Sequence, residues 1–294
     1  GLAAALAEWV TRGAGFLDGP VGVAIEREVS RRGGALRASD FAYATATWAP
    51  PAAGEVGSRT VWTTPAPTHG PGLIDAVSTV AVGDGPAAVH RAVMTAIARQ
   101  RTELGDSGTS MVSAADATGT VVVIVHSNSY PRFGSGIVVP EYDLTLANRA
   151  GRGFTPEPGH PNFPDAGRRP ATTLHAWAVS DRDGVPRFAG GTPGGVNQLP
   201  WNAQALARIL AGEQRPGVLV TAPLWEWLPD DDGVRIEDGF GPDDVEALTA
   251  AVSRVVTAPR WGCKSAQQVI RIPHPGEAWE AAADPRTVGL ALAV

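Results

Sequence analysis

A threonine directly before a strand-like run is the feature of this sequence that most constrains its fold and chemistry. Thr109 follows Gly108 and precedes a strand pattern over 111–115. If the bond between the two is cut, the freed α-amine of Thr109 can serve as the base for its own hydroxyl. Downstream, the step Gly194-Gly195 can present two backbone N–H groups to a developing oxyanion. Each dipeptide alone is common, but with the motifs below they predict an enzyme with a threonine nucleophile.

Composition excludes several other classes of function. The 294 residues suffice for one large α/β domain or two small ones, and 44% of them are hydrophobic. The net charge of −6 argues against a nucleic-acid surface, which needs clustered Lys and Arg. No run approaches the roughly 18 apolar residues of a membrane span. The six histidines lack close ligand spacing, so neither a metal site nor a cofactor is expected. Cys263 is the single cysteine and cannot form an internal disulfide.

The start of the chain gives little information about its compartment. Gly1-Leu2 is not an initiator sequence, and no signal peptide is visible. We therefore expect a processed or truncated piece of a longer protein. The compartment is not determined, with the cytoplasm slightly favoured by the lack of a visible signal.

Hydrophobic periodicity predicts strand pairs mixed with helices. Helices are expected over 19–31, 86–104, 202–211 and 242–256. Strands are expected over 58–63, 111–115, 120–126, 174–180, 185–190, 218–221, 234–236 and 267–272. Turn signals at 116–119 and 181–184 join four of these strands into two hairpins. The irregular stretch over 127–173 is unusually long, which indicates a functional role. The whole pattern predicts stacked sheets covered by helices.

A series of short motifs follows the order found in the γ-glutamyltranspeptidases. The motifs are Gly15–Gly19, Thr64–Gly70, Thr109–Ser113 with Asp116, Phe133–Gly136, Arg169–Thr173, Gly191–Gly195, Ala222–Pro223 with Trp227–Asp230, and Ala283–Arg286. The third resembles the family's nucleophile strand, and the sixth resembles its oxyanion loop. Because they cover nearly the whole chain, the sequence resembles a divergent member of this family.

The resemblance implies an α+β fold of the N-terminal-nucleophile hydrolase type, a four-layer αββα sandwich. It also implies that the precursor cuts itself between Gly108 and Thr109, so that the chain's own large and small fragments remain partners. Residues 1–108 would match the later part of the large subunit, and 109–294 the small subunit, in one intertwined domain. The family's early large-subunit segment, with its arginine for the substrate carboxylate, is not matched, and the linker before Thr109 is short.

Four further hydroxyl residues are candidates for substrate binding. Thr172 and Thr173 stand where the family has the Ser-Ser pair that grips the substrate's α-carboxylate. Their alternative role is that of two β-branched residues at the entry to a strand. Ser127 and Ser129 fall near the family's paired Thr and Asn downstream of the nucleophile. An extra residue shortly after them leaves this register open, and Asn128 competes with Ser129 for the second role.

The stretch over 146–154 departs from the family pattern. The family has acidic residues here that bind the α-ammonium of glutamate, whereas this chain has Ala150 and Gly153 at the expected positions. Arg152 adds a positive charge, which would repel an ammonium and favour an anion. The alternative is that Arg152 is simply solvated. In either case specificity for γ-glutamyl compounds is expected to be weakened.

The sequence thus predicts a γ-glutamyltranspeptidase-like acyltransferase or hydrolase acting on a small-molecule amide, including non-γ-glutamyl ones. Thr109 would be the nucleophile, and Gly194 and Gly195 the oxyanion donors. One alternative is a non-catalytic homologue that does not cleave itself. Another is a biosynthetic family member that cleaves a bond next to a carbonyl in a secondary-metabolite precursor. No nucleic acid or membrane partner is expected.

Overall fold

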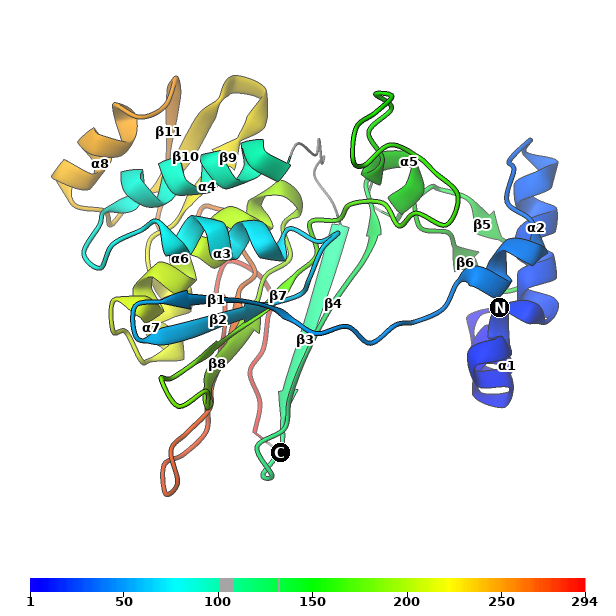
Figure 1. Cartoon of the computed structure of the whole chain (residues 1–294), viewed down its shortest axis with the longest axis horizontal. Helices are drawn as coiled ribbons and strands as arrows, with labels where there is room; N and C mark the ends of the chain where they lie inside the picture. The colour runs from blue at the N-terminus through cyan, green and yellow to red at the C-terminus, as the bar shows by residue number, and fades with distance from the viewer. Residues whose placement is uncertain (101–107, 132, 294) are drawn as a thin grey trace.

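The computed structural model describes residues 1–100, 108–131 and 133–293. Figure 1 shows the arrangement of its elements. The helices are α1 (Leu2–Arg12), α2 (Pro20–Arg31), α3 (Gly70–Ser78), α4 (Pro86–Gln100), α5 (Arg149–Gly153), α6 (Gln198–Leu210), α7 (Pro216–Thr221) and α8 (Pro242–Thr249). The strands are β1 (Ala52–Val56), β2 (Arg59–Thr63), β3 (Gly108–Ala115), β4 (Val121–Ser129), β5 (Val138–Val139), β6 (Leu144–Thr145), β7 (Ala176–Ser180), β8 (Pro186–Gly191), β9 (Trp225–Leu228), β10 (Gly233–Glu237), β11 (Arg254–Ala258), β12 (Gln268–Arg271) and β13 (Glu280–Ala283).

The central layer is a six-stranded sheet of order β1-β2-β7-β8-β12-β13, in which every neighbouring pair is antiparallel. The register places Gly191 at the end of β8 opposite both Ala176 of β7 and Gln268 of β12. The segment before β7 and the segment after β8 therefore emerge at the same end of the sheet. The β7–β8 turn lies at the opposite end.

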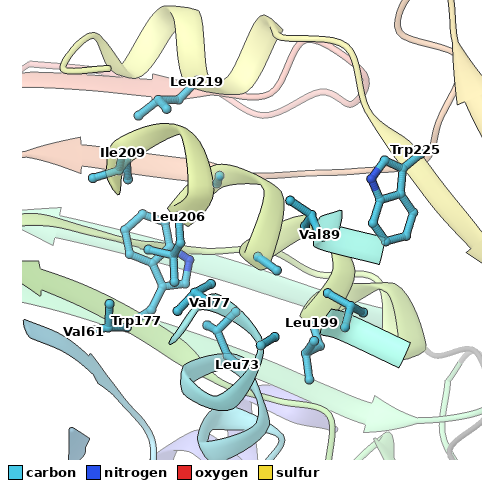
Figure 2. Packing of buried hydrophobic residues seen from close by; sticks show 14 of the residues in the cluster. Val61, Leu73, Val77, Val89, Trp177, Leu199, Leu206, Ile209, Leu219 and Trp225 are labelled. Atoms are coloured by element: carbon cyan, nitrogen blue, oxygen red, sulfur yellow. The ribbon is translucent and has the colours of Figure 1, made fainter. Parts of the chain in front are cut away.

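Helices α3, α4, α6 and α7 form the layer that covers one face of this sheet (Figure 1). Leu206, Ile209 and Leu219 project from the helices, and Trp177 from the sheet, into a core whose labelled members are fully or almost fully buried (Figure 2). Burial of such side chains stabilises each by about 1.5–3 kcal/mol relative to exposure. The apolar faces of the helices thus pack against one face of the sheet and bury it.

The β3–β4 hairpin forms a second sheet layer on the other face. Gln268 of β12 fixes it through two hydrogen bonds, one between its Oε1 and Ser113 Oγ at 2.9 Å and one from its Nε2 to the Met111 carbonyl at 2.9 Å. The outward face of the hairpin is apolar and exposed at Val112 and Ile124, which pair across the strands. The described residues thus build one helix layer and two sheet layers, and the fold is α+β as predicted.

A buried ionic cluster connects the three-stranded sheet β11-β10-β9 to the C-terminal segment. The side chains of Glu237 and Arg286 are fully buried, and Arg286 Nε donates to Glu237 Oε1 at 2.7 Å. Arg286 Nη1 also donates to Asp284 Oδ1 at 3.0 Å and to the Val220 carbonyl at 2.8 Å, while Nη2 donates to the Ala222 carbonyl at 2.8 Å. Two of the sequence motifs, Ala222–Pro223 and Ala283–Arg286, therefore meet at one point.

The N-terminal helices lie to one side of the layered body (Figure 1). Helix α2 carries Val21, Ile25 and Val29 on one face, and this face packs with Val139 of β5 in a separate small core. The part of the chain preceding β1 is thus anchored on the segment between β4 and α5.

Local predictions from sequence were mostly confirmed, with three corrections. The predicted strand over 218–221 is wrong, because Pro216 begins helix α7 and its apolar residues pack against α6, β12 and β13. The predicted helix over 242–256 ends at Thr249, and its last residues belong to β11, which pairs with β10. Strand β1 was not predicted from the sequence. The end of the helix predicted over 86–104 lies outside the described residues.

Candidate active site at the Gly108–Thr109 bond

The Gly108–Thr109 bond lies at an irregularity in the ladder between β3 and β4. Gly108 pairs with Ser129 and Thr109 with Ser127, so the register shifts between the two residues. Ser127 Oγ donates a hydrogen bond of 2.6 Å to the carbonyl oxygen of Gly108. This hydroxyl therefore polarises the carbonyl that a Thr109 hydroxyl would attack.

The Ser127 hydroxyl is itself oriented by the backbone. The N–H of Ser129 donates to Ser127 Oγ at 2.9 Å, which leaves the hydroxyl proton directed at Gly108. Ser129 is 2% exposed and adopts a left-handed conformation with φ 69°. Such a conformation in a non-glycine residue is held only where the surrounding structure requires it. Ser129 therefore contacts the Ser127 hydroxyl through its backbone N–H, and the choice between Asn128 and Ser129 as a substrate-binding residue stays open.

The nucleophile strand and the predicted oxyanion loop lie on facing elements. Met111, two residues after Thr109, packs so closely on Gly191 that a Cβ built there would be 3.2 Å from the Met111 sulfur. Gly191 ends β8, and the chain continues directly through Pro193 to Gly194 and Gly195. The fold thus places β3 beside the end of β8 from which the Gly194–Gly195 turn continues.

The Gly194–Gly195 step has the properties of an anion-binding turn. Both residues have positive φ, 142° and 57°, and neither N–H donates to another described residue. A Cβ on Gly194 would lie 2.2 Å from the ring of Trp201, so only glycine fits. Asn197 ties the turn to β9, because its side chain accepts from the Trp227 N–H at 2.7 Å and donates to the Trp227 carbonyl at 3.0 Å.

Thr173 is held by a buried polar network. Gln198 Nε2 donates to Thr173 Oγ1 at 2.9 Å, and His175 Nδ1 donates to the Thr173 carbonyl at 2.7 Å. His175 Nε2 accepts from Asn202 Nδ2 at 2.9 Å, and Asn202 Oδ1 accepts from Trp177 Nε1 at 2.9 Å. Each contact suits a neutral imidazole, and burial lowers the pKa of His175 to about 4.

Thr172 is placed by pairing with the motif that precedes α3. Its N–H donates to the Pro67 carbonyl at 3.0 Å, and its carbonyl accepts from the His69 N–H at 3.0 Å. Burial, with His175 and Arg149 nearby, lowers the pKa of His69 to about 3. Thr173 is therefore held by side-chain contacts in a buried network, whereas Thr172 is half-buried and held through its backbone.

Helix α5 brings to this pair of threonines an arginine that the sequence analysis missed. Asn162 joins the helix to the residue before Thr172, because its Nδ2 donates to the Gly153 carbonyl at 2.5 Å and its Oδ1 accepts from the Ala171 N–H at 3.0 Å. Arg149 Nη2 is buried and has no hydrogen-bond partner among the described residues. Burial lowers the pKa of Arg149, and no described carboxylate pairs with it.

Arg152, the predicted cation, is exposed on the same helix. Its guanidinium stacks over the Tyr130 ring at 4.8 Å from the centroid. The sequence could have indicated Arg149 as a second candidate, because Arg149 precedes Arg152 by three residues and residues at this spacing are neighbours on a helix. The partial burial of Arg149 is a tertiary feature, which local pattern does not reveal.

The described residues contain no group of three or more His, Cys, Asp or Glu side chains placed to hold a metal ion. Within the same part of the chain, no helix has the length and apolar character needed to cross a bilayer. Cys263 is buried, and burial raises the pKa of its thiol to about 12, so it is not a nucleophile.

Known proteins resemble this chain in sequence. A family model described as gamma-glutamyltranspeptidase matches residues 83–294. The glutathione hydrolase proenzyme of Escherichia coli (strain K12) is 29% identical over 192 residues, which are 61% of this chain and 32% of that protein. The oxamate amidohydrolase proenzyme of Klebsiella pneumoniae is 26% identical over 191 residues, which are 64% of this chain and 36% of that protein. The chain spans about one third of the length of these curated relatives.

The fold is also found among solved structures. The cephalosporin acylase from Bacillus halodurans superposes with a TM-score of 0.74 at 22% identity, over 94% of this chain and 58% of that one. At this identity the likeness concerns the fold, which is that of an N-terminal-nucleophile hydrolase. Because the family model matches well over half of the sequence, including the β3–β4 hairpin and the Gly194–Gly195 turn, the chain belongs to the γ-glutamyltranspeptidase family.

Proposed function

We propose that this protein is a self-cleaving acyltransferase or hydrolase that uses Thr109 to attack small-molecule amides whose acyl group carries a carboxylate. The observation that carries the proposal is the hydrogen bond from Ser127 to the Gly108 carbonyl, at the one irregular step of the β3–β4 ladder. An acyl shift requires a polarised carbonyl beside the attacking hydroxyl, and the Ser127 hydroxyl polarises the carbonyl next to Thr109.

Self-cleavage would begin with attack of Thr109 Oγ on the carbonyl carbon of Gly108. The C–N bond then breaks, the nitrogen takes the proton and becomes the α-amine of Thr109, and an ester joins the two residues. Ser127 stabilises the negative charge that develops on the carbonyl oxygen. Water hydrolyses the ester to give a Gly108 carboxylate and a free Thr109. The products would be fragments 1–108 and 109–294.

Turnover would repeat this chemistry on a substrate. Thr109 Oγ attacks the amide carbon while the α-amine, which titrates near pH ~8 in model compounds, accepts the proton. The N–H groups of Gly194 and Gly195 donate to the oxyanion. The leaving amine takes the proton back, and water or a second amine releases the acyl group from Thr109.

The unpaired guanidinium of Arg149 supports a preference for anionic substrates. A buried guanidinium N–H group without an acceptor is costly, and Nη2 of Arg149 has none among the described residues, so a carboxylate in the site would relieve that cost. Thr173 Oγ1 already accepts from Gln198, so its proton remains available to donate to the same carboxylate. The relative from Klebsiella pneumoniae is named for oxamate, an amide that carries a carboxylate.

Intact mass of the purified protein tests the proposal. We expect two fragments whose masses correspond to 1–108 and 109–294, with a free amine on Thr109, while Thr109→Ala remains one chain. The same preparation is then assayed with glutaryl and γ-glutamyl anilides, of which the glutaryl compound lacks the ammonium and should react faster. A single intact chain without activity would instead support the non-catalytic homologue.

A further inference from the structure

A cavity lies at the opposite end of the central sheet from Thr109. It has a volume of about 320 Å³, and four arginines line it together with Asp181: Arg59 after the β1–β2 turn, Arg182 and Arg187 around the β7–β8 turn, and Arg271 at the end of β12. Strands β7 and β8 are antiparallel, and the cavity lies at their shared turn. Thr173 and Gly194 lie beyond the opposite ends of the same two strands. The cavity is therefore separate from the candidate active site.

Two of its arginines are already neutralised within the protein. Arg187 Nε pairs with Asp181 Oδ2 at 2.8 Å, and Arg271 pairs with Glu277 and Glu280, each at 2.7 Å. The two arginine side chains are only 16–17% exposed, whereas Glu277 and Glu280 reach them from the surface and are 45% exposed. Any charge left over for a ligand must come from the other two arginines.

Arg59 and Arg182 provide that excess charge. Neither forms a hydrogen bond or an ion pair with a described residue, and Arg59 Nη1 is buried without a partner. Burial lowers the pKa of Arg59, and the charge of Asp181 only partly offsets this effect. A buried donor that lacks an acceptor destabilises the folded state, more so when it is charged, and a ligand that accepts from it would remove this cost.

We propose that this cavity binds a small molecule through a phosphate group held between Arg59 and Arg182. A phosphate monoester carries nearly two negative charges at neutral pH, which match the two unpaired guanidiniums. Each guanidinium can donate two parallel N–H bonds to its oxygens, a geometry that lysine cannot offer. The volume is within the range of small-ligand pockets. The bound phosphate would give Arg59 Nη1 its acceptor.

Calorimetric titration with inorganic phosphate and with phenyl phosphate, at constant ionic strength, tests the proposal. We expect both to bind, and Arg59→Gln and Arg182→Gln each to weaken binding at least tenfold. Arg260→Gln removes an exposed arginine that stacks on Trp261 outside the cavity, and it should bind as the wild type does. Succinate, a dicarboxylate of the same charge, should bind more weakly than phenyl phosphate.

Four outcomes would overturn the proposal. They are the absence of binding, unchanged affinity in both cavity variants, an equal loss in Arg260→Gln, and succinate binding as tightly as phosphate. Circular dichroism checks that each variant is folded. Arg182 is exposed, so its replacement keeps the experiment decisive even if Arg59→Gln fails to fold. Because Thr109 takes no part, the result is independent of self-cleavage and turnover.

Discussion

The hydroxyl of Ser127 lies 2.6 Å from the carbonyl oxygen of Gly108 and donates a hydrogen bond to it. Loss of one donor to a developing oxyanion typically slows a reaction by on the order of 10²–10³. We therefore expect Ser127→Ala to slow self-cleavage by this factor, followed as loss of the intact chain on denaturing gels. Ser110→Ala alters an exposed hydroxyl beside Thr109 and is the matched control. Normal cleavage of Ser127→Ala would exclude a role for this hydroxyl.

The oxyanion turn predicts different effects at its two glycines. Gly195→Val should lower turnover per folded protein by on the order of 10²–10³, because a bulky side chain hinders approach of the N–H to the substrate. Since Gly195 has φ 57°, a β-branched residue is also strained there, and the folded fraction is measured alongside. Turnover at the wild-type rate in a folded Gly195→Val protein would exclude Gly195 as a donor. Gly194→Ala should in addition lower the melting temperature, because its Cβ would collide with Trp201. Gly212→Ala separates collision from backbone strain, since Gly212 has φ 107° but open space around its Cβ.

We expect Arg149 to bind the carboxylate of the substrate. A hydrogen bond to a charged group contributes about 1.5–3 kcal/mol, so Arg149→Gln should lower kcat/KM for a glutaryl anilide by roughly 10- to 100-fold. The butyryl anilide, which lacks the carboxylate, should be almost unaffected. Arg152→Gln is the matched control, because its stacked, exposed guanidinium should contribute less. An equal loss with both anilides would show that Arg149 supports the fold rather than the substrate.

Acid should destabilise the protein through its buried histidines. The pKa of His175 is about 4 in the folded protein and near ~6.5 when unfolded, so its neutral form favours folding above pH ~6.5. This stability is lost as the pH falls from ~6.5 toward 4, because only the unfolded chain gains the proton, and the difference amounts to about 3 kcal/mol. Urea unfolding at pH 7 and pH 5 measures the part of this loss that falls within that range, about 2 kcal/mol. His175→Gln should reduce the pH dependence, whereas the exposed His126→Gln should leave it unchanged.

The buried ionic cluster predicts a large cost when one partner is removed. Arg286→Met leaves Glu237 charged and buried, which should lower the free energy of unfolding by about 3–5 kcal/mol. Adding Glu237→Gln to this variant should recover part of the loss. Arg254→Met breaks an exposed pair with Asp231 and should cost less than about 1 kcal/mol. Similar costs for Arg286→Met and Arg254→Met in urea titrations would contradict this account.

Local pattern predicted those elements whose signals lie within a few residues. The two hairpins were predicted because alternating strand residues and turn residues are adjacent in the sequence. The structure lengthens each strand of the first hairpin by three residues at one end, so that β3 begins at 108 and β4 ends at 129. The strand predicted over 218–221 failed because its β-branched residues suit a strand, while a proline at the first turn and packing against α6 favour a helix. Propensity is a weak guide when burial acts against it.

The sequence by itself determined the family, the α+β class and the position of the threonine, because these depend on residue order and short motifs. Only the tertiary structure decided that Ser127 reaches the Gly108 carbonyl, since this requires the register shift between β3 and β4. It also decided that Arg149 is half-buried with its Nη2 enclosed, whereas Arg152 is exposed. Strand register and burial depend on contacts between residues far apart in the chain, and a local sequence pattern does not contain this information.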